Sequence, residues 1–310
     1  MTSSRIDWLV FLALAFMWGS SYLFIKIAVG DLGTFTLVAL RLVIGAALLW
    51  TVVKIAGQRL PRSPRIYGHL TVMGVVNIAL PFVLITWAER NVESSLAAIL
   101  TSVVPLFVVV LAPLYIDDEP MRANGVVGLV IGFVGVVVLT GRNLGSIGSD
   151  TLSELALLGA ALSYAAGAVY ARRNVRGLAP TIPAVFQVSI ATVITAVIAI
   201  ATEHPWTVRP GLAGLGAIVW LGILGSGLAY LAFFRLLSHW GATRTAAVAY
   251  VLPIVGIVLG FLVLGEAIDE RTIAGTALII AGVALTNSRF GGRVILSRTR
   301  PRIVGSAGPD

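Results

Sequence analysis

The chain of 310 residues contains no cysteine, so it can form no disulfide, no thiolate nucleophile and no thiolate metal site. It is also poor in charge: 12% of the residues are Asp, Glu, Lys or Arg, which is about half the fraction of a soluble domain. Hydrophobic residues make up 58% of the chain, and the mean hydropathy is +0.97. This composition excludes an ordinary soluble domain and indicates a membrane protein.

Ten apolar windows are each long enough to cross a bilayer as a helix. They cover residues 7–28, 34–53, 67–88, 95–116, 123–140, 152–172, 181–202, 211–236, 244–264 and 271–287. The first window continues past Trp18 without an A-x-A cleavage site, so we expect a membrane span there rather than a signal peptide. The fold class predicted is all-α integral membrane, with ten transmembrane helices.

Ionisable groups are missing from the middle of these windows, apart from one arginine. All fourteen acidic residues and all three histidines map to window ends or loops. An integral membrane enzyme would need a nucleophile with a base, or metal ligands, at one depth. None can be assembled here, so we predict no catalytic residue, no metal site and no cofactor.

The net charge is +8, and nearly all Lys and Arg residues lie in or beside the connections between windows. If alternate connections share a side, the side that holds the N-terminus carries sixteen Lys and Arg residues and the other side carries five. Positive charge favours the cytoplasm. We therefore predict a multi-pass protein of a bacterial-type inner membrane with both termini cytoplasmic, and we read the basic excess as a topology signal rather than as a nucleic-acid-binding patch.

Two stretches of the chain resemble each other, Ser94 to Gly141 and Thr243 to Asn287. In each, an apolar run broken by one proline leads through an acidic turn to a run with spaced glycines. The second proline, Pro253, follows the first, Pro105, by 148 residues, and the spacing holds to within one residue at the later glycines. The chain therefore contains an internal repeat of five windows.

Because five is an odd number, the second repeat enters the membrane from the opposite side. We predict two inverted five-helix repeats, residues 1–145 and 146–288, and a basic cytoplasmic tail, residues 289–310, that is mostly disordered. The acidic turns Asp117–Glu119 and Glu266–Glu270 should then lie at opposite faces. Two inverted halves that exchange conformations face opposite compartments in turn, which is the physical basis of alternating access.

Several motifs together resemble a known family. The first window contains W-G-S-S-Y from Trp18 to Tyr22, the second contains Leu40-Arg41, and the first copy of the repeat reads A-(x)6-P, an acidic turn and G-(x)3-G-(x)2-G. This combination resembles the EamA-type carriers of the drug/metabolite transporter superfamily, over nearly the whole chain. The resemblance implies a ten-helix carrier with a central substrate cavity that exports amino acids and related metabolites, with some branches carrying drugs or sugars. The first copy departs from the pattern at Asp117-Asp118, so a glutamate role is carried over only to Glu266.

Polar and aromatic side chains near mid-membrane are the candidate substrate-binding groups. Aromatic faces with a few amides and hydroxyls suit a zwitterion with an apolar side chain, or a flat ring. The candidates are Trp18, Ser21, Tyr22, Arg41, Asn77, Trp87, Ser102, Tyr164, Gln187 and Tyr250. Each one could instead serve only to pack helices together, and Trp87 could belong to an interfacial aromatic belt.

Arg41 lies well inside the second window, roughly 10 Å from its outer end at 1.5 Å per residue. An arginine in the membrane indicates function by default, and its guanidinium could receive a substrate carboxylate with two hydrogen bonds. The alternative is a structural role, in which Arg41 binds helix-end carbonyls or an acid such as Glu89 or Glu93.

Pro105 and Pro253 each remove one backbone donor within an apolar window, which bends a helix and frees a carbonyl. They could be hinges that gate the two halves, or static kinks required for packing.

The leading hypothesis is an exporter of amino acids or similar small metabolites that works by alternating access. An exporter of aromatic or cationic drugs is the alternative, although a cationic drug would favour a central carboxylate, and none is visible. Since no proton carrier is visible at mid-membrane, we expect facilitated, gradient-driven or weakly coupled transport. The partners predicted are a small-molecule substrate and the lipid bilayer, and a complete repeat in one chain makes a monomer plausible.

Overall fold

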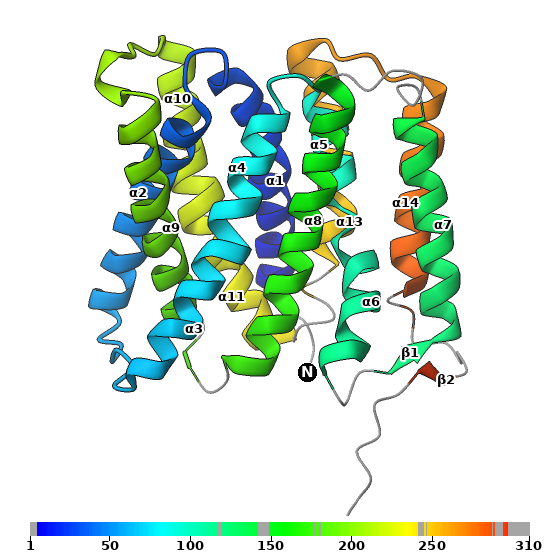
Figure 1. The fold of residues 1–310 in the computed structure, drawn as a ribbon, viewed down its shortest axis with the longest axis horizontal. Coiled ribbons are helices and arrows are strands. Elements are labelled where there is room, and N and C mark those ends of the chain that lie inside the picture. Colours follow the sequence, from blue (N-terminus) through cyan, green and yellow to red (C-terminus); the bar gives the residue numbers. More distant parts are fainter. Residues whose placement is uncertain are drawn as a thin grey trace, which may run out of the picture.

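The computed structural model describes residues 5–116, 120–141, 149–175, 178–179, 181–240, 245, 247–286, 288 and 294–296. Within these residues the chain is almost entirely helical, and the helices run roughly side by side (Figure 1). The acidic turn Asp117–Glu119 and most of the tail 289–310 lie outside the described residues, so their predicted places are not tested.

The first five windows form five helical rods, three of them continuous and two interrupted. The elements are α1 (Arg5–Ala28), α2 (Thr34–Ile55), α3 (Pro64–Gly74), η1 (Val75–Ala79), α4 (Leu80–Ala88), α5 (Ser94–Thr101), α6 (Val104–Tyr115) and α7 (Ala123–Thr140). The short η1 is π-helical and joins α3 to α4. A two-residue break separates α5 from α6.

The last five windows form a matching series. The elements are α8 (Ser149–Asn174), α9 (Thr181–Thr202), the short 3-10 turn η2 (Pro205–Thr207), α10 (Leu212–Trp220), η3 (Leu221–Leu228), α11 (Ala229–Trp240), α13 (Val248–Leu259), η4 (Gly260–Leu264) and α14 (Glu270–Thr286). Both η3 and η4 are π-helical and continue the helices that precede them. Every predicted window therefore coincides with a helical rod of the described chain.

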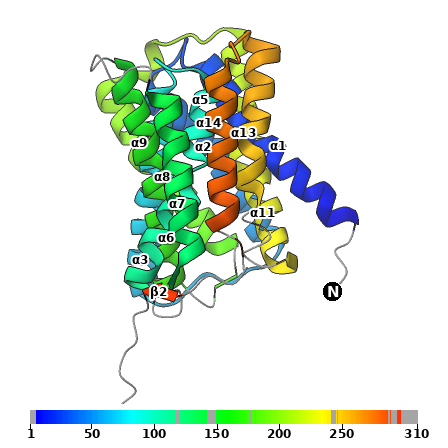
Figure 2. The same ribbon diagram turned by 90° about the vertical axis from the view of Figure 1, so that its right-hand side faces the viewer.

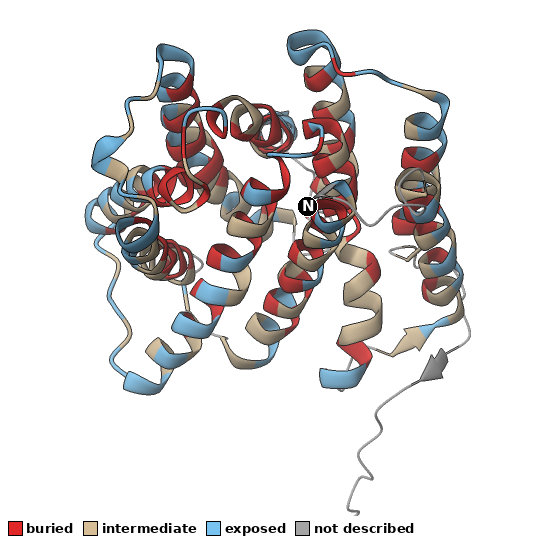
Figure 3. Ribbon diagram, turned by 45° about the horizontal axis from the view of Figure 1, so that its top comes forward, coloured by how far each residue is buried: buried red, intermediate tan, exposed pale blue. Residues whose placement is uncertain are grey.

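The length and composition of the rods fit a membrane protein. Among the described residues, eight helices are long and apolar enough to cross a membrane, and Val248–Leu264 is a shorter apolar helix. Large side chains such as Leu9, Val193 and Leu262 are exposed on the outside of the bundle, while buried residues gather between the helices (Figure 3). Such an apolar exterior is suited to lipid.

Successive rods alternate in direction along the chain (Figure 1). We call the end of the bundle where α1 begins the lower end and the end where α2 begins the upper end, as they stand in Figure 1. The first rod of the N-terminal series rises from the lower end, whereas α8, the first rod of the C-terminal series, descends from the upper end. In the turned view of Figure 2, the beginning of α1 leans away from the bundle.

The helices α2 and α9 pack against each other in antiparallel fashion. At the upper end, Glu203 accepts hydrogen bonds from the backbone N–H of Phe35 (3.0 Å) and of Thr36 (2.8 Å). In the middle, Trp50 Nε1 donates to Ser189 Oγ at 2.9 Å. At the lower end, the hydroxyl of Thr181 donates to Oε1 of Gln58, three residues after α2. These three contacts hold the pair together along its whole length.

The helices α7 and α14 are packed through glycines. A Cβ built on Gly282 would lie 2.6 Å from the backbone oxygen of Gly128, and one on Gly135 would lie 2.8 Å from the backbone oxygen of Gly275. Only glycine permits so close an approach of two helix backbones. The spaced glycines of the repeat are therefore the interface between these two helices.

One small β-ribbon was not predicted. β1 (Met121–Arg122) pairs in antiparallel fashion with β2 (Val294–Leu296), with Met121 opposite Leu296. Residues 294–296 are therefore an ordered part of the tail 289–310, which was expected to be mostly disordered. The physical reason is local: Val294, Ile295 and Leu296 form an apolar, partly β-branched run that can pair with an exposed strand.

Candidate functional site

Arg41 of α2 lies in the interior of the bundle and is 3% exposed. Its Nε donates a hydrogen bond of 3.1 Å to Ser226 Oγ in η3. The carbon atom of its guanidinium lies 4.4 Å from the centre of the Phe82 ring in α4, which is a cation–π contact. A hydroxyl and an aromatic face therefore hold this cation.

The guanidinium of Arg41 is not neutralised by a neighbour. Of the carboxylates that the structure describes, none lies within ion-pairing distance of Arg41. The hydrogen bond to Ser226 uses one of several N–H donors, and no acceptor for the others is found in the described part of the chain. The predicted structural partners Glu89 and Glu93 thus do not pair with it. What remains is a fixed positive group in a low-polarity interior, with unused donors.

The residues next to Arg41 come from both series of helices. A Cβ built on Gly225 of η3 would lie 2.9 Å from Ser21 Oγ and 3.2 Å from Arg41 Nη2, so the absence of a side chain at Gly225 leaves room for both groups. The hydroxyls of Tyr164 and Tyr230 lie close enough to act electrostatically on Arg41.

Tyr22 is the third phenol within electrostatic range of Arg41. Its hydroxyl shares a hydrogen bond of 2.6 Å with Thr101 Oγ1, at the end of α5. We call Ser21, Tyr22, Arg41, Tyr164, Gly225, Ser226, Tyr230 and Phe82 the arginine cluster. Four of its members, Ser21, Tyr22, Arg41 and Tyr164, were predicted as candidates, and α1, α2 and α8 place them together.

A second polar contact joins η1 to α9. Asn77 Nδ2 donates to Gln187 Oε1 at 2.8 Å, and Gln187 Nε2 donates to the backbone oxygen of Pro183 at 3.0 Å. A Cβ built on Gly167 of α8 would lie 2.8 Å from Asn77 Oδ1. Asn77 and Gln187 were both predicted as candidates, and here one hydrogen bond joins them. We call them the amide pair.

The arginine cluster and the amide pair both use a π-helical segment. Ser226 and Gly225 lie in η3, and Asn77 lies in η1. A π-helical turn contains one extra residue, which leaves the regular backbone hydrogen bonds of an α-helix locally disrupted, and such segments are frequent at functional sites. These two segments sit at corresponding places in the two series, because η1 shifted by 148 residues falls inside η3.

The other predicted candidates lie apart from these two groups or only beside them. Trp18 is half-buried, with its ring centre 6.1 Å from that of Tyr230 and 5.5 Å from that of Phe233. Ser102 Oγ donates to the backbone oxygen of Ile99 at the break between α5 and α6. The Tyr250 hydroxyl donates to the backbone oxygen of Val283 in α14, which fits the packing role.

Trp87 is 39% exposed near the upper end of α4. This exposure fits the interfacial belt rather than a lining position.

The two prolines occupy different local structures. Pro105 stands in the first turn of α6, directly after the break at Ser102 and Val103, where its missing N–H leaves no helix bond unmade. Pro253 lies inside α13, where it removes a hydrogen bond of the helix. The two prolines thus occupy different positions in their helices, the start of α6 and the interior of α13. A hinge role for either proline stays a prediction.

Four members of the arginine cluster were not predicted from the sequence: Phe82, Gly225, Ser226 and Tyr230. A signal for one of them was present, because Tyr230 follows Phe82 by the same 148 residues that relate the two prolines. A search for aromatic residues at equivalent positions of the two repeats would have found both rings.

A cavity of about 280 Å³ lies where α4 ends and α5, α8 and α14 begin, at the upper end of the bundle. Its polar lining includes Asn91, Glu93, Asp150, Glu154, Asp269 and Arg271. No member of the arginine cluster lines this cavity. The predicted central cavity around the candidates therefore stays a prediction.

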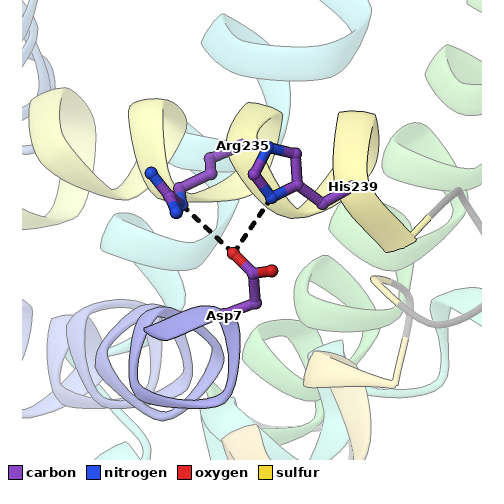
Figure 4. Close-up of polar contacts among 3 residues, drawn as sticks. All are labelled: Asp7, Arg235 and His239. Atoms are coloured by element: carbon purple, nitrogen blue, oxygen red, sulfur yellow. Dashed lines mark hydrogen bonds and ion pairs between the residues drawn. The ribbon is translucent and has the colours of Figure 1, made fainter. Parts of the chain in front are cut away.

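The lower end carries a different polar contact. Asp7 of α1 accepts hydrogen bonds from Arg235 Nε at 3.2 Å and from His239 Nδ1 at 3.1 Å, both on α11 (Figure 4). The Asp7 side chain is 6% exposed, whereas those of Arg235 and His239 are about half exposed. This contact ties the start of α1 to the end of α11.

Comparisons with known proteins agree with this architecture. The model of the EamA-like transporter family matches the chain twice, over residues 6–141 and over residues 151–288. An uncharacterized transporter of Archaeoglobus fulgidus is 26% identical over 89% of this chain and 96% of its own length. The uncharacterized inner membrane transporter YedA of Escherichia coli K12 is 27% identical over 88% of each chain.

Two further matches concern substrate and fold. A protein of Streptantibioticus cattleyicolor described as a probable terminal-alkyne amino-acid exporter is 26% identical over 94% of this chain and 97% of its own length. A protein of known crystal structure matches with a TM-score of 0.67 and 23% identity, over 91% of this chain and 96% of that one. The latter likeness shows the fold alone.

Proposed function

This chain belongs to the EamA-like transporter family, and we propose that it exports amino acids or related small metabolites by alternating access. The family and its relatives are transporters rather than enzymes. The substrate class is our inference, supported by one relative with an amino acid as its cargo and by the residues described above.

The observation that carries the substrate class is the environment of Arg41. Its buried guanidinium makes one hydrogen bond, to Ser226, and has no described carboxylate partner. A substrate carboxylate would supply both the missing charge and the missing acceptors, in the bidentate geometry that guanidinium groups favour. Tyr164, Tyr230 and the ring of Phe82 would contact the rest of a small substrate.

The mechanism rests on an inverted repeat. Packing supports it: α2 and α9, the second rods of the two series, are antiparallel partners through Thr36 with Glu203 and Gln58 with Thr181. The double match of one family model supports it as well. In this proposal residues 1–145 and 146–288 are the two halves, and they rock about the arginine cluster.

The orientation in the membrane follows from charge. We place both termini on the cytoplasmic side because the connections predicted on their side carry most of the Lys and Arg residues of the sequence. A bacterial-type inner membrane is the setting, in line with the description of the Escherichia coli relative. One chain contains both halves, so we propose that the monomer transports.

Counterflow in proteoliposomes tests this function. Vesicles that contain the purified protein are loaded with one unlabelled amino acid at a time and diluted into a trace of the same amino acid in radiolabelled form. We expect saturable accumulation of label for at least one amino acid with an apolar side chain. No accumulation across aliphatic and aromatic amino acids would contradict the substrate class.

The alternative substrate, an aromatic drug, is covered by the same vesicles. The ring centre of Trp18 lies 6.1 Å from that of Tyr230 and 5.5 Å from that of Phe233. These aromatic rings could stack on a flat molecule. Because Arg41 repels a cation, a neutral or anionic dye is the appropriate competitor. Exchange of the dye without exchange of any amino acid would favour the drug exporter.

A further inference from the structure

Glu89, the residue that follows α4, is a buried carboxylate without a hydrogen bond. It is 0% exposed, and neither of its carboxylate oxygens has a partner in the part of the chain that the structure describes. The sequence places it at the end of a span, where a carboxylate would normally reach water. A buried ionised carboxylate without hydrogen bonds is strongly disfavoured.

Lys26, the basic group bonded to the backbone of Glu89, does not bond to its carboxylate. Lys26 of α1 donates hydrogen bonds of 2.7 Å to the backbone oxygens of Glu89 and Val92. It therefore caps the carbonyl end of α4, as a cation at a helix C-terminus does. The side chain of Glu89 is left with the electrostatic influence of Lys26 but without a bond to it.

The charged and titratable groups around Glu89 come from α1, α2 and the turn before α14. Lys26 and Arg41 favour its ionised form, whereas the carboxylate of Glu266, in the turn before α14, opposes that form. Tyr22 of α1 is also within electrostatic range. Glu89 stands just beyond the last residue of its span, and burial raises the pKa of its carboxyl well above the ordinary value despite Lys26.

Glu266 provides an internal comparison. It is also buried, but its Oε1 accepts hydrogen bonds from the N–H and the hydroxyl of Ser94, at 2.7 and 2.8 Å, and its Oε2 accepts one from the N–H of Ser95, at 2.9 Å. These bonds satisfy an ionised carboxylate at the start of α5. The same end of the bundle thus holds one carboxylate that is bonded as an anion and one that is not.

We propose that Glu89 is a proton-binding site that couples proton movement to opening of the upper end. This inference rests on the proposed transport function. In the arrangement seen here, in which Glu89 is fully buried, a proton from water is bound to a carboxylate oxygen of Glu89, forming an O–H bond. When α1 and α4 separate, the bonds of Lys26 to the two carbonyls break, water reaches Glu89, and the proton leaves to water while Lys26 pairs with the carboxylate.

The proposal revises the expectation of weakly coupled transport. That expectation treated every acidic residue as a helix-end or loop residue, without regard to what packs around it. Glu89 is at a helix end and yet fully enclosed.

Infrared difference spectroscopy of the protein in lipid vesicles tests the site without any substrate. Over a titration from acidic to alkaline pH, we expect the C=O stretching band of a protonated carboxyl that persists at neutral pH and disappears only at high pH. Glu89→Gln should lose this band. Glu270→Gln removes an exposed carboxylate at the same end of the bundle and should keep it. A wild-type protein without such a band overturns the proposal, and no variant is needed for that result.

Counterflow measures substrate exchange, and accumulation under a pH gradient measures whether that exchange is coupled to protons. Together they test proton coupling separately from the transport function. With an imposed pH gradient, each coupled proton changes substrate accumulation by up to about tenfold per pH unit. We expect wild-type and Glu270→Gln vesicles to respond and Glu89→Gln vesicles to exchange substrate without this response. Glu89→Asp, which keeps a carboxyl, should retain the response with a shifted midpoint, which guards against a folding defect.

The outcomes are distinguishable. If substrate exchange is saturable but indifferent to the pH gradient in the wild type, the coupling inference is wrong and the transport function stands. If the protonated-carboxyl band behaves as expected but no amino acid exchanges, the proton site stands and the proposed substrate class is wrong.

Discussion

Arg41 in α2 and Gln187 in α9 stand at equivalent positions of the two repeats, since a shift of 146 residues places one on the other. Each reaches across to a π-helical segment: Arg41 bonds to Ser226 in η3, and Gln187 bonds to Asn77 in η1. The chemistry of the two contacts differs, because one holds a charge without a described counter-ion and the other is a hydrogen bond between two neutral amides.

This difference indicates that Arg41 is suited to binding a substrate, whereas the amide pair is suited to holding helices together. A neutral amide pair gains its hydrogen bond within the protein and has little reason to bind an outside group. A buried guanidinium with unused donors is stabilised when an acceptor arrives. We therefore infer that the arginine cluster contacts the substrate and that the amide pair holds η1 against α9. Four predictions measure how far the two contacts differ.

The largest expected effect is that of Arg41→Met. Counterflow of a carboxylate substrate should fall at least about tenfold, the equivalent of about 1.4 kcal/mol, because methionine offers no donor. The temperature of unfolding in detergent should fall little, since the change removes a buried charge that has no described ion partner. Arg41→Lys keeps the charge but not the fork of donors and should recover only part of the exchange. A protein that unfolds more easily but transports normally per folded molecule would assign Arg41 to packing.

Gly225→Ala should come next, because its methyl group would crowd Ser21 and Arg41 together at 2.9 and 3.2 Å. Overpacking of this kind costs about 1–3 kcal/mol, so we expect a lower unfolding temperature and a several-fold loss of exchange.

The matched control is Gly216→Ala in α10, where no atom lies within 4 Å of the added Cβ. This variant should unfold at the wild-type temperature or slightly above it. Equal behaviour of the two variants would show that Gly225 is not confined by Arg41.

The amide pair should show a stability effect without a transport effect. Asn77→Leu or Gln187→Leu alone leaves the remaining amide, buried for Gln187 and half-buried for Asn77, without the hydrogen bond between them, at a cost of about 1–3 kcal/mol. The double variant should be less destabilised than the sum of the single ones, because both polar groups are then gone. A double-mutant cycle of unfolding temperatures measures this coupling. Loss of exchange in the folded double variant would move the amide pair into the binding site.

The smallest effect is expected for Ser226→Ala. It removes one hydrogen bond to Arg41, worth about 0.5–1.5 kcal/mol, and leaves the guanidinium free to bind a carboxylate. The concentration of substrate at half-maximal exchange should change by less than about tenfold, and the maximal rate should not change. Complete loss of exchange would mean that Ser226 itself contacts the substrate.

The sequence predicted the rods better than their contacts. All ten windows are helices because each is a continuous apolar run, and lipid leaves the backbone no other way to satisfy its polar groups. The π-helical character of η1, η3 and η4 was not predictable, since it depends on how an extra residue is accommodated against a neighbouring helix.

The candidate site was predicted in part for the same reason. Arg41 stands out in any apolar run, and Ser21 and Tyr22 follow from their place in a polar patch. Phe82 and Tyr230 look like ordinary apolar positions until the cation beside them is known. Glu89 shows most clearly what the sequence could not predict. Its position at a helix end suggests exposure to water, but the helices that pack around it bury it completely.

The glycine contact between α7 and α14 bears on how such a chain could be assembled. The last helix of one half is buried against the last helix of the other by direct backbone approach, Gly128 with Gly282 and Gly135 with Gly275. Together with α2 and α9, it makes the interface between the halves resemble that between two subunits of a dimer. The peptide link between Gly141 and Ser149 would then keep the two series of helices near each other, while the helix surfaces would determine how they pair. Two separately translated halves, co-expressed from a gene cut at that point, would carry in these surfaces the information they need to find each other.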